Sequence, residues 1–273
     1  MAVLNTETSI ENHSGNAQTD SGSGEHSVIF EHVDFVYPDG EEAVLKDISF
    51  SAKSGETVAF IGSTGSGKSS LIQLIPRFYD RASGNIYIDG QKIEDLDINA
   101  LRSKIGFVPQ KAHLFSGTIE ENIRFGKPDA TMDEIIHAAK IAQAYDFIME
   151  KPHQFQEQIV EGATNVSGGQ KQRLSIARAL IRKPEIYIYD DSFSALDFKT
   201  DARLRKALKP EIKNAIVFLV AQRVSTILDA DKIVVLDEGK IAGIGTHREL
   251  LASCPIYYEI AASQLSKEEL TYA

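Results

Sequence analysis

The sequence is nearly free of cysteine: Cys254 carries the single thiol among 273 residues. One cysteine cannot make an internal disulfide, which excludes a disulfide-stapled scaffold and fits a reducing compartment. Cys254 stands near the C-terminus, and we expect it to be an inert small residue rather than a nucleophile. Stability must then come from a packed core, for which this length is sufficient.

Two further absences narrow the function. No stretch approaches roughly 18 uncharged apolar residues, so we expect no membrane-spanning helix in this sequence. The opening residues, MAVLNTETSI, lack the basic segment and apolar run of a signal peptide.

The formal net charge is −10, which argues against binding nucleic acid by general attraction to its phosphates. We therefore predict no nucleic-acid partner.

The first half of the chain reads mainly as strands. Residues 1–27 are rich in Ser, Thr, Asn, Gly and Glu, a composition that predicts a flexible linker. Hydrophobic periodicity then predicts further elements. In order, they are a strand at 28–37, a strand, turn and strand over 44–62, a helix from Gly67 to about Arg77, and strands at 84–90 and 104–110.

The second half combines helices with buried strands. Residues 112–182 read as mostly helical, and Thr131 with Glu134, like Ser167 with Gln170, has the spacing of a capping box. Two apolar runs, 185–190 and 215–222, flank a charged helical stretch at 198–213. Runs this continuous predict a parallel sheet covered on both faces. A hairpin at 232–245 follows, and Thr246 with Glu249 opens the final helices.

A phosphate-binding motif stands early in the chain. GSTGSGKS, Gly62 to Ser69, matches G-x-x-x-x-G-K-[ST] between a predicted strand and a predicted helix. Backbone N–H groups would bind phosphate oxygens, Lys68 would neutralise the β- and γ-phosphates, and Ser69 would give its hydroxyl to Mg²⁺. The residues that we expect to hold a nucleoside triphosphate here are Gly62, Ser63, Thr64, Gly65, Ser66, Gly67, Lys68, Ser69 and Ser70.

An acid at the end of a buried strand supports this site. Asp190 closes the run EIYIYD, and ligands of α/β sheets bind at the carboxyl ends of the strands. We expect Asp190 to hold Mg²⁺, directly or through water. A surface acid at a strand end is common by itself, but not beside a phosphate loop.

The stretch NVSGGQKQRLSIARAL, residues 165–180, identifies a family. It resembles the signature of ABC (ATP-binding cassette) ATPases. The other motifs of that family follow in order: Tyr37 in FVYPDG, the phosphate loop, Gln110 in FVPQ, the acid strand, and SALD at 194–197. The resemblance covers about residues 28–265.

The resemblance implies roles for several residues. The ring of Tyr37 would stack on the adenine of ATP. Gln110 would sense Mg²⁺ and the attacking water, and would join the core to the helical insert. The signature, Ser167, Gly168, Gly169 and Gln170, would face the γ-phosphate held by a second cassette, so that two head-to-tail cassettes enclose two ATP molecules. The helix N-terminus and the bare glycines make a suitable anion site.

The resemblance also implies a fold. We expect an α/β protein: a P-loop ATPase core with a mostly parallel sheet, an N-terminal antiparallel β-subdomain and an inserted α-helical subdomain. The core would comprise 28–111 and 183–265, and the helical subdomain 112–182. A linker at 1–27 and a tail at 266–273 would complete the chain.

Several segments resemble the exporter branch of the family, namely 116–126, 160–170 and 243–251. In that branch Glu161 and its neighbours lie against the membrane domain, and VLNTETSI resembles the stretch after the last membrane helix. We expect a cassette cut from a larger polypeptide, on the cytoplasmic side of the cell membrane, attached through a transmembrane domain absent from this chain.

Other hypotheses stay open on the sequence alone. The chain could be a soluble ATPase subunit of an importer, or a regulatory module that binds ATP without hydrolysing it. It could also be a non-transport ABC ATPase acting in DNA repair or on ribosomes. Those proteins typically have a long coiled-coil insertion or two cassettes in one chain, and neither is present here.

Two positions depart from the family pattern. Hydrolysing members usually have Glu where this chain has Asp191, and His where it has Gln222. Asp is one methylene shorter, and Gln cannot become cationic or carry a proton. Both departures resemble the degenerate subunit of heterodimeric multidrug-type exporters. We predict that Asp191, Gln222, Gln110 and Lys68 form a site that hydrolyses ATP slowly, while the signature (with Val166 where Leu is usual) completes the active site of a different cassette.

Overall fold

The computed structural model describes residue 10, residues 26–266 and residue 270. Most of the predicted linker, 1–27, and of the predicted tail, 266–273, therefore lies outside the described residues. Ser27 already belongs to the first strand, β1. The domain boundaries at 111/112 and 182/183 stay predictions.

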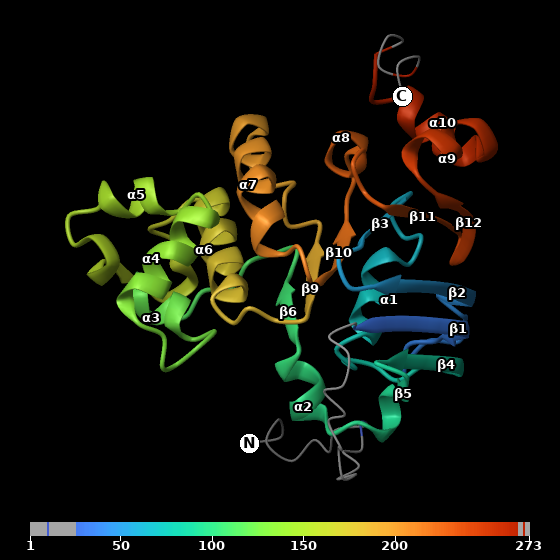
Figure 1. The fold of residues 1–273 in the computed structure, drawn as a ribbon, viewed down its shortest axis with the longest axis horizontal. Helices are drawn as coiled ribbons and strands as arrows, with labels where there is room; N and C mark the ends of the chain where they lie inside the picture. The colour runs from blue at the N-terminus through green and yellow to red at the C-terminus, as the bar shows by residue number, and fades with distance from the viewer. Residues whose placement is uncertain (1–9, 11–25, 267–269, 271–273) are drawn as a thin grey trace.

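A six-stranded sheet forms the centre of the molecule (Figure 1). Its strand order is β12-β11-β3-β10-β9-β6, and every neighbouring pair is parallel except β11 with β12. The mostly parallel core is thus confirmed. The strands are β3 (Thr57–Gly62), β6 (Ile105–Val108), β9 (Ile186–Asp190), β10 (Ile216–Val220), β11 (Lys232–Asp237) and β12 (Lys240–Gly245).

A four-stranded antiparallel sheet, in the order β2-β1-β4-β5, packs beside the central sheet. Phe50 of β2 joins the two sheets, because its ring packs edge-on against Phe60 of β3 and Phe218 of β10 with centroids 5.4 and 6.3 Å away. The predicted antiparallel subdomain is therefore present. Its strands are β1 (Ser27–Phe35), β2 (Leu45–Lys53), β4 (Ser83–Ile88) and β5 (Gln91–Lys92).

Helix α1 (Lys68–Leu74) follows the phosphate loop and ends earlier than predicted. The sequence pattern predicted a helix to about Arg77. Pro76 has no N–H to continue the helical hydrogen bonds, and Arg77 takes a left-handed conformation with φ 52°. The amide of Arg77 donates to Leu74 O at 3.0 Å, which closes the helix. A short helix, α2 (Ile98–Ser103), precedes β6.

The helical insert lies to one side of the sheet (Figure 1). The capping boxes predicted at Thr131–Glu134 and Ser167–Gln170 are both present and begin α4 and α6. The insert contains α3 (Ile119–Arg124), α4 (Met132–Ile141), α5 (Tyr145–Met149) and α6 (Gly168–Leu180), with short strands β7 (Gly117–Thr118) and β8 (Gln158–Ile159) and 3₁₀ turns η3 (Gln154–Gln156) and η4 (Glu161–Ala163).

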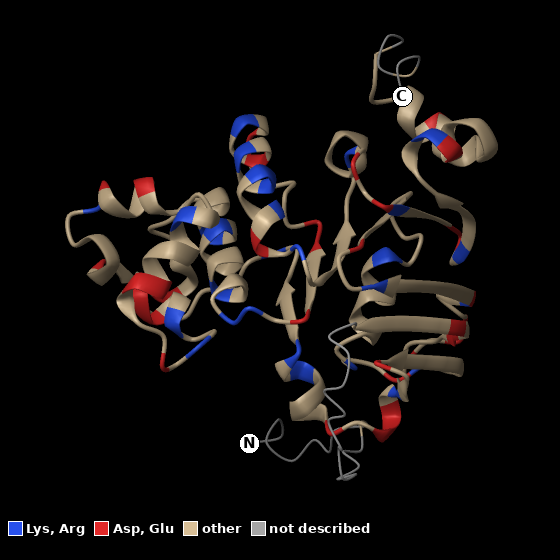
Figure 2. Cartoon of the chain, in the orientation of Figure 1, with Lys and Arg blue, Asp and Glu red and all other residues tan. Residues whose placement is uncertain are grey.

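The remaining helices are α7 (Phe198–Glu211), α8 (Val224–Ile227), α9 (His247–Ser253) and α10 (Pro255–Ala262), with the 3₁₀ turn η2 (Ile93–Asp95) earlier in the chain. The predicted capping box of Thr246 and Glu249 begins α9. Figure 2 shows several basic residues along α7, with acids among them. Cys254 is buried between α9 and α10. Among the described residues, every helix is too short or too polar to cross a membrane.

Candidate nucleotide-binding site

The predicted site residues converge because their strands are parallel neighbours. The strands β3, β10, β9 and β6 lie side by side in that order, so their carboxyl ends meet at one edge of the sheet. The phosphate loop follows β3, and the segment containing Gln222 follows β10. Asp190 ends β9, with Asp191 next, and Gln110 comes just after β6.

Two glycines of the phosphate loop are required by close packing. A Cβ on Gly62 would clash with the carbonyl oxygen of Leu236, and one on Gly67 would stand 2.6 Å from Leu45 Cδ2. Gly67 also has φ 97°, in the left-handed region. The backbone can therefore curl tightly where α1 begins. The tip, Ser63, Thr64 and Gly65, is exposed to solvent.

The ammonium group of Lys68 lies across this loop. It donates to Gly62 O at 2.9 Å, Ser63 O at 2.7 Å and Ser66 Oγ at 3.2 Å. Burial lowers the pKa of Lys68, while the carboxylates of Asp191 and Asp190 oppose that shift. A half-buried cation inside a curl of backbone, beside a helix N-terminus, fits a bound phosphate group.

Ser69 and Asp190 form a pair of oxygen ligands next to the loop. Ser69 Oγ donates to Asp190 Oδ1 at 2.9 Å. Asp190 is only 5% exposed, and burial raises the pKa of its carboxyl, as does the nearby Asp191, while the Ser69 hydroxyl opposes the shift. Mg²⁺ prefers such oxygen donors and commonly uses one carboxylate together with substrate phosphates. These two residues therefore fit the predicted magnesium site.

Asp191 accepts two amides on a single oxygen. Gln222 Nε2 donates to Asp191 Oδ2 at 2.8 Å, and Gln110 Nε2 donates to the same oxygen at 3.1 Å. The Asp191 amide donates to Val220 O at 3.0 Å, and the residue has φ 47°, a region that Asp tolerates better than most residues. The strand order explains the two bonds, because β9 lies between β10 and β6.

This arrangement limits the chemistry of Asp191. The two amides use both lone pairs of Oδ2, so a water that attacks a phosphate must displace an amide or bind through Oδ1. Burial raises the pKa of the Asp191 carboxyl, while hydrogen bonding by Ser194 and Gln110 and the cations Lys68 and Arg223 oppose the shift. Asp191 is therefore fixed by hydrogen bonds and has little contact with solvent, since only 6% of its surface is exposed.

Tyr37 is positioned by an aromatic cluster and one hydrogen bond. Its hydroxyl lies 2.8 Å from Ser70 Oγ, and its ring packs edge-on against Phe35 and Tyr79, with centroids 4.7 and 5.1 Å away. Ser70 is buried, so its hydroxyl serves to hold Tyr37. The predicted contact of Ser70 with nucleotide, like the stacking of Tyr37 on adenine, stays a prediction.

The signature residues lie apart from the phosphate loop. In Figure 1 helix α6 stands on the other side of β6 and β9 from α1. Ser167 Oγ accepts from the Gln170 amide at 3.2 Å, and Gln170 Oε1 accepts from the Ser167 amide at 3.0 Å. A Cβ on Gly169 would stand 3.3 Å from Ala195 O, whereas one on Gly168 would meet nothing within 4 Å. Packing within this chain does not explain Gly168.

Two hollows in the described part of the chain lie away from the phosphate loop. One of about 670 Å³ is lined in part by Tyr187, and one of about 490 Å³ by Tyr189. These two residues share a face of β9 because they are two positions apart, and helix α7 contributes to both hollows. The phosphate loop lines neither hollow.

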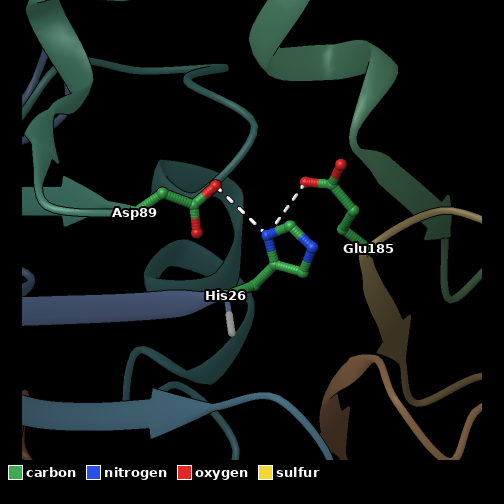
Figure 3. Close-up of side chains that lie close together, drawn as sticks. All are labelled: His26, Asp89 and Glu185. Carbon is green, nitrogen blue, oxygen red and sulfur yellow. Dashed lines mark hydrogen bonds and ion pairs between the residues drawn. The ribbon is translucent and has the colours of Figure 1, made fainter. Parts of the chain in front are cut away.

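One cluster was not predicted from the sequence. Figure 3 shows His26 between Asp89 and Glu185, with its Nδ1 3.3 Å from an oxygen of each. These atoms could be taken for a metal site. Lys104 Nζ, however, already lies 2.6 Å from Asp89 and 3.0 Å from Glu185. We therefore interpret the cluster as an ion-pair network that ties the start of β1 to the start of β9.

Arg223 was also missed by the sequence analysis. Its guanidinium lies 4.7 Å from the ring centroid of Phe198, and its Nη2 donates to Ser194 O at 3.5 Å. Phe198 is 71% exposed. In the sequence, the signal for this contact was Phe198, an aromatic residue directly after SALD. The contact links the segment after β10 to the loop after β9.

The chain is similar to known transporter proteins. The family described as "ABC transporter" matches residues 45–194. An uncharacterized ABC transporter ATP-binding protein of Bacillus subtilis (strain 168) is 47% identical over 241 residues, which is 88% of this chain and 42% of that protein. A putative multidrug export ATP-binding/permease protein of Staphylococcus aureus (strain NCTC 8325 / PS 47) is 48% identical over 237 residues, 87% of this chain and 41% of that protein.

The solved structures include a close match in fold. The structure of a bacterial Atm1-family ABC exporter with ATP bound superposes with a TM-score of 0.91 at 35% identity. The match covers 97% of this chain and 46% of that one. This chain thus has the mixed α/β fold of an ABC cassette. It spans about two fifths of the length of the curated relatives that it matches.

Replacing Asp190 by Asn should separate stability from ligand binding. Because burial raises the pKa of Asp190, the stability that its protonation provides is complete below the unfolded pKa and is lost as pH rises through the folded pKa. At pH 7.5 the buried charge is a cost, so Asp190→Asn should melt at the same or a higher temperature without ligand. In the unmodified chain, Mg-ATP at a hundredfold excess over Kd should stabilise the folded state by about 2.7 kcal/mol. The rise in melting temperature that results should be mostly lost in Asp190→Asn.

The matched control is Asp237→Asn, which changes an acid at the end of β11 on the same sheet edge. It should keep the Mg-ATP shift. Thermal melts at pH 7.5, with and without Mg-ATP, measure both effects. A full Mg-ATP shift in Asp190→Asn would contradict the magnesium assignment.

Proposed function

Because this chain belongs to the ABC transporter family, we propose that it is the cytosolic ATP-binding cassette of an exporter and binds Mg-ATP but hydrolyses it slowly at its own site. The observation that carries the second part is the carboxylate of Asp191, whose Oδ2 accepts both Gln110 and Gln222. A carboxylate oxygen that already accepts two amide hydrogen bonds has little capacity left to polarise a water molecule.

The binding function rests on the phosphate loop and its neighbours. Lys68 neutralises the β- and γ-phosphates, and the loop amides bind phosphate oxygens. Ser69 and Asp190 hold Mg²⁺. Gln110 also serves as a ligand of the metal and positions the attacking water. Bound Mg²⁺ supplies charge stabilisation to the phosphates. The Ser69–Asp190 pair and the Lys68 contacts support these roles.

Slow hydrolysis follows from reach more than from basicity. The ordinary pKa values of Asp and Glu differ by only about 0.4 units. The missing methylene matters more, because a misplacement of about 1 Å can cost on the order of a hundredfold in rate. Gln222 can donate to Asp191, as it does here, but it cannot carry the positive charge of a protonated His.

The partner that we propose is a second, different cassette. The first turn of α6 is suited to bind an anion. Ser167 and Gly168 are exposed there, and α6 stands on the other side of β6 and β9 from α1. Gly168 leaves open space that a nucleotide bound to another cassette could fill. The partner would carry Glu and His at the two altered positions, and this chain's signature would complete the partner's active site. Val166, in place of the usual Leu, is buried.

The membrane partner would bind the helical insert. Phe115 and Phe125 are exposed, with ring centroids 4.6 Å apart, and the Arg178 guanidinium lies over both rings. Val160, next to Glu161, is 46% exposed. Such a cluster is typical of a protein interface.

The S. aureus relative is called a multidrug export ATP-binding/permease protein. This name favours an exporter over an importer subunit, and it favours the cytoplasmic face of the membrane as the location of this chain.

The degenerate-site proposal is tested by restoring the two residues. We expect the unmodified chain to hydrolyse Mg-ATP slowly and the double variant Asp191→Glu with Gln222→His to be faster by on the order of a hundredfold, because the carboxylate then reaches the water. Steady-state phosphate release measures both rates. Robust turnover by the unmodified chain that Asp191→Ala abolishes would sink the proposal, and equal slow rates would count against these two residues as the cause.

The head-to-tail geometry is tested by complementation in that restored background. Adding Lys68→Ala disables the phosphate loop, and adding Gly168→Asp disables the signature, so each protein alone should be inactive. Mixing them should recover part of the activity, since one site of each mixed dimer then has an intact loop and an intact signature. Continued inactivity of the mixture would contradict the trans arrangement. Thermal melts check folding, which Gly168→Asp should preserve because its side chain enters open space.

A further inference from the structure

The segment that carries Gln222 is held by a side chain from the far end of the chain. Gln264 lies just beyond α10 and uses both halves of its amide. Its Nε2 donates to the backbone oxygen of Gln222 at 2.9 Å. Its Oε1 accepts from the backbone amide of Val224 at 2.8 Å. The two bonds bracket Arg223, so the amide spans the turn that leads from β10 into α8.

We infer that Gln264 is a positioning residue: it fixes the orientation of the Gln222 segment and thereby the contact between the side chain at 222 and Asp191. The inference rests on the proposed function of this site. Gln264 and Asp191 both bind Gln222: Gln264 binds its backbone oxygen, and the side-chain Nε2 of Gln222 donates to Asp191 Oδ2 at 2.8 Å. A shift of the Gln222 backbone would carry the side-chain amide away from the Asp191 carboxylate.

The segment needs such support because its own secondary structure provides little. Helix α8 has four residues, Val224–Ile227, and its N-cap, Arg223, makes no side-chain capping bond. The first N–H groups of a helix have no partner within the helix, and Gln264 satisfies the one on Val224. It therefore acts as an N-cap supplied from 40 residues away.

Gln264 is itself anchored at its backbone. Its amide donates to Ala261 O at 3.0 Å, and the amide of Leu265 donates to the same oxygen at 2.8 Å. Ala261 is fully buried, and Leu265 packs against the core. The Gln264 side chain itself is exposed. Exposed hydrogen bonds contribute little to global stability, so the larger effect of this contact should be on the orientation of the Gln222 segment.

The test compares Gln264→Ala, which removes both bonds, with Gln264→Glu, which keeps an acceptor for Val224 but loses the donor to Gln222. The control is Ser263→Ala, whose hydroxyl donates only to Ile260 O in the same turn. Two readouts are used: the NMR signal of the Gln222 side-chain NH₂ in the otherwise unmodified chain, and kcat and KM for Mg-ATP in the Asp191→Glu, Gln222→His background.

We expect Gln264→Ala to shift the Gln222 signal and to lower kcat several-fold with KM unchanged, Gln264→Glu to have a smaller effect, and Ser263→Ala to have none. A Gln222 signal that does not move in Gln264→Ala would overturn the inference, and so would an unchanged kcat in an active background. If the restored background shows no turnover, the proposed function fails, and the NMR signal alone still decides the role of Gln264.

Discussion

The order of strands in the central sheet is the constraint on which the site depends. Strand β9 lies between β10 and β6, and all three are parallel. The acid that follows β9 therefore stands between the segments that follow its two neighbours, and Asp191 accepts one amide from each side. The same sheet places β3, and with it the phosphate loop, one strand beyond β10. The predicted metal ligands, the phosphate loop and both glutamines thus share one edge of the sheet because of its strand order.

The chain has two predicted anion-binding surfaces, the phosphate loop and the first turn of α6, and they do not meet within it. The phosphate loop is open to solvent at its tip, and helix α6 stands on the other side of β6 and β9 from α1, the helix that follows the loop (Figure 1). The two surfaces differ in their side chains: the loop carries the cation Lys68 beside the predicted metal ligands Ser69 and Asp190, while the first turn of α6 offers the exposed Gly168 and a helix N-terminus. On our proposal, two different cassettes bring such surfaces together, and the one built on this chain's loop mainly retains ATP.

Much of the fold and of the site followed from local sequence signals. Continuous apolar runs predicted the parallel strands, capping boxes marked three helix starts, and the phosphate-loop motif lies between a strand and a helix as predicted. Contacts between distant segments did not follow. No sequence motif marks the hydrogen bond between Gln264 and Val224, which lie 40 residues apart, or the contact between Ser70 and Tyr37. The end of α1 was overestimated because the helical pattern outweighed Pro76. Such contacts depend on packing that no short motif encodes.

The central claim is that this chain's own site retains ATP instead of splitting it. The most direct measurement is a single-turnover experiment in which the chain, in excess over labelled Mg-ATP, is quenched with acid and the bound nucleotide is identified. The account predicts that the bound nucleotide stays ATP long after the variant with Asp191→Glu and Gln222→His has converted its own to ADP. Conversion to ADP at a similar rate in both proteins would contradict the account.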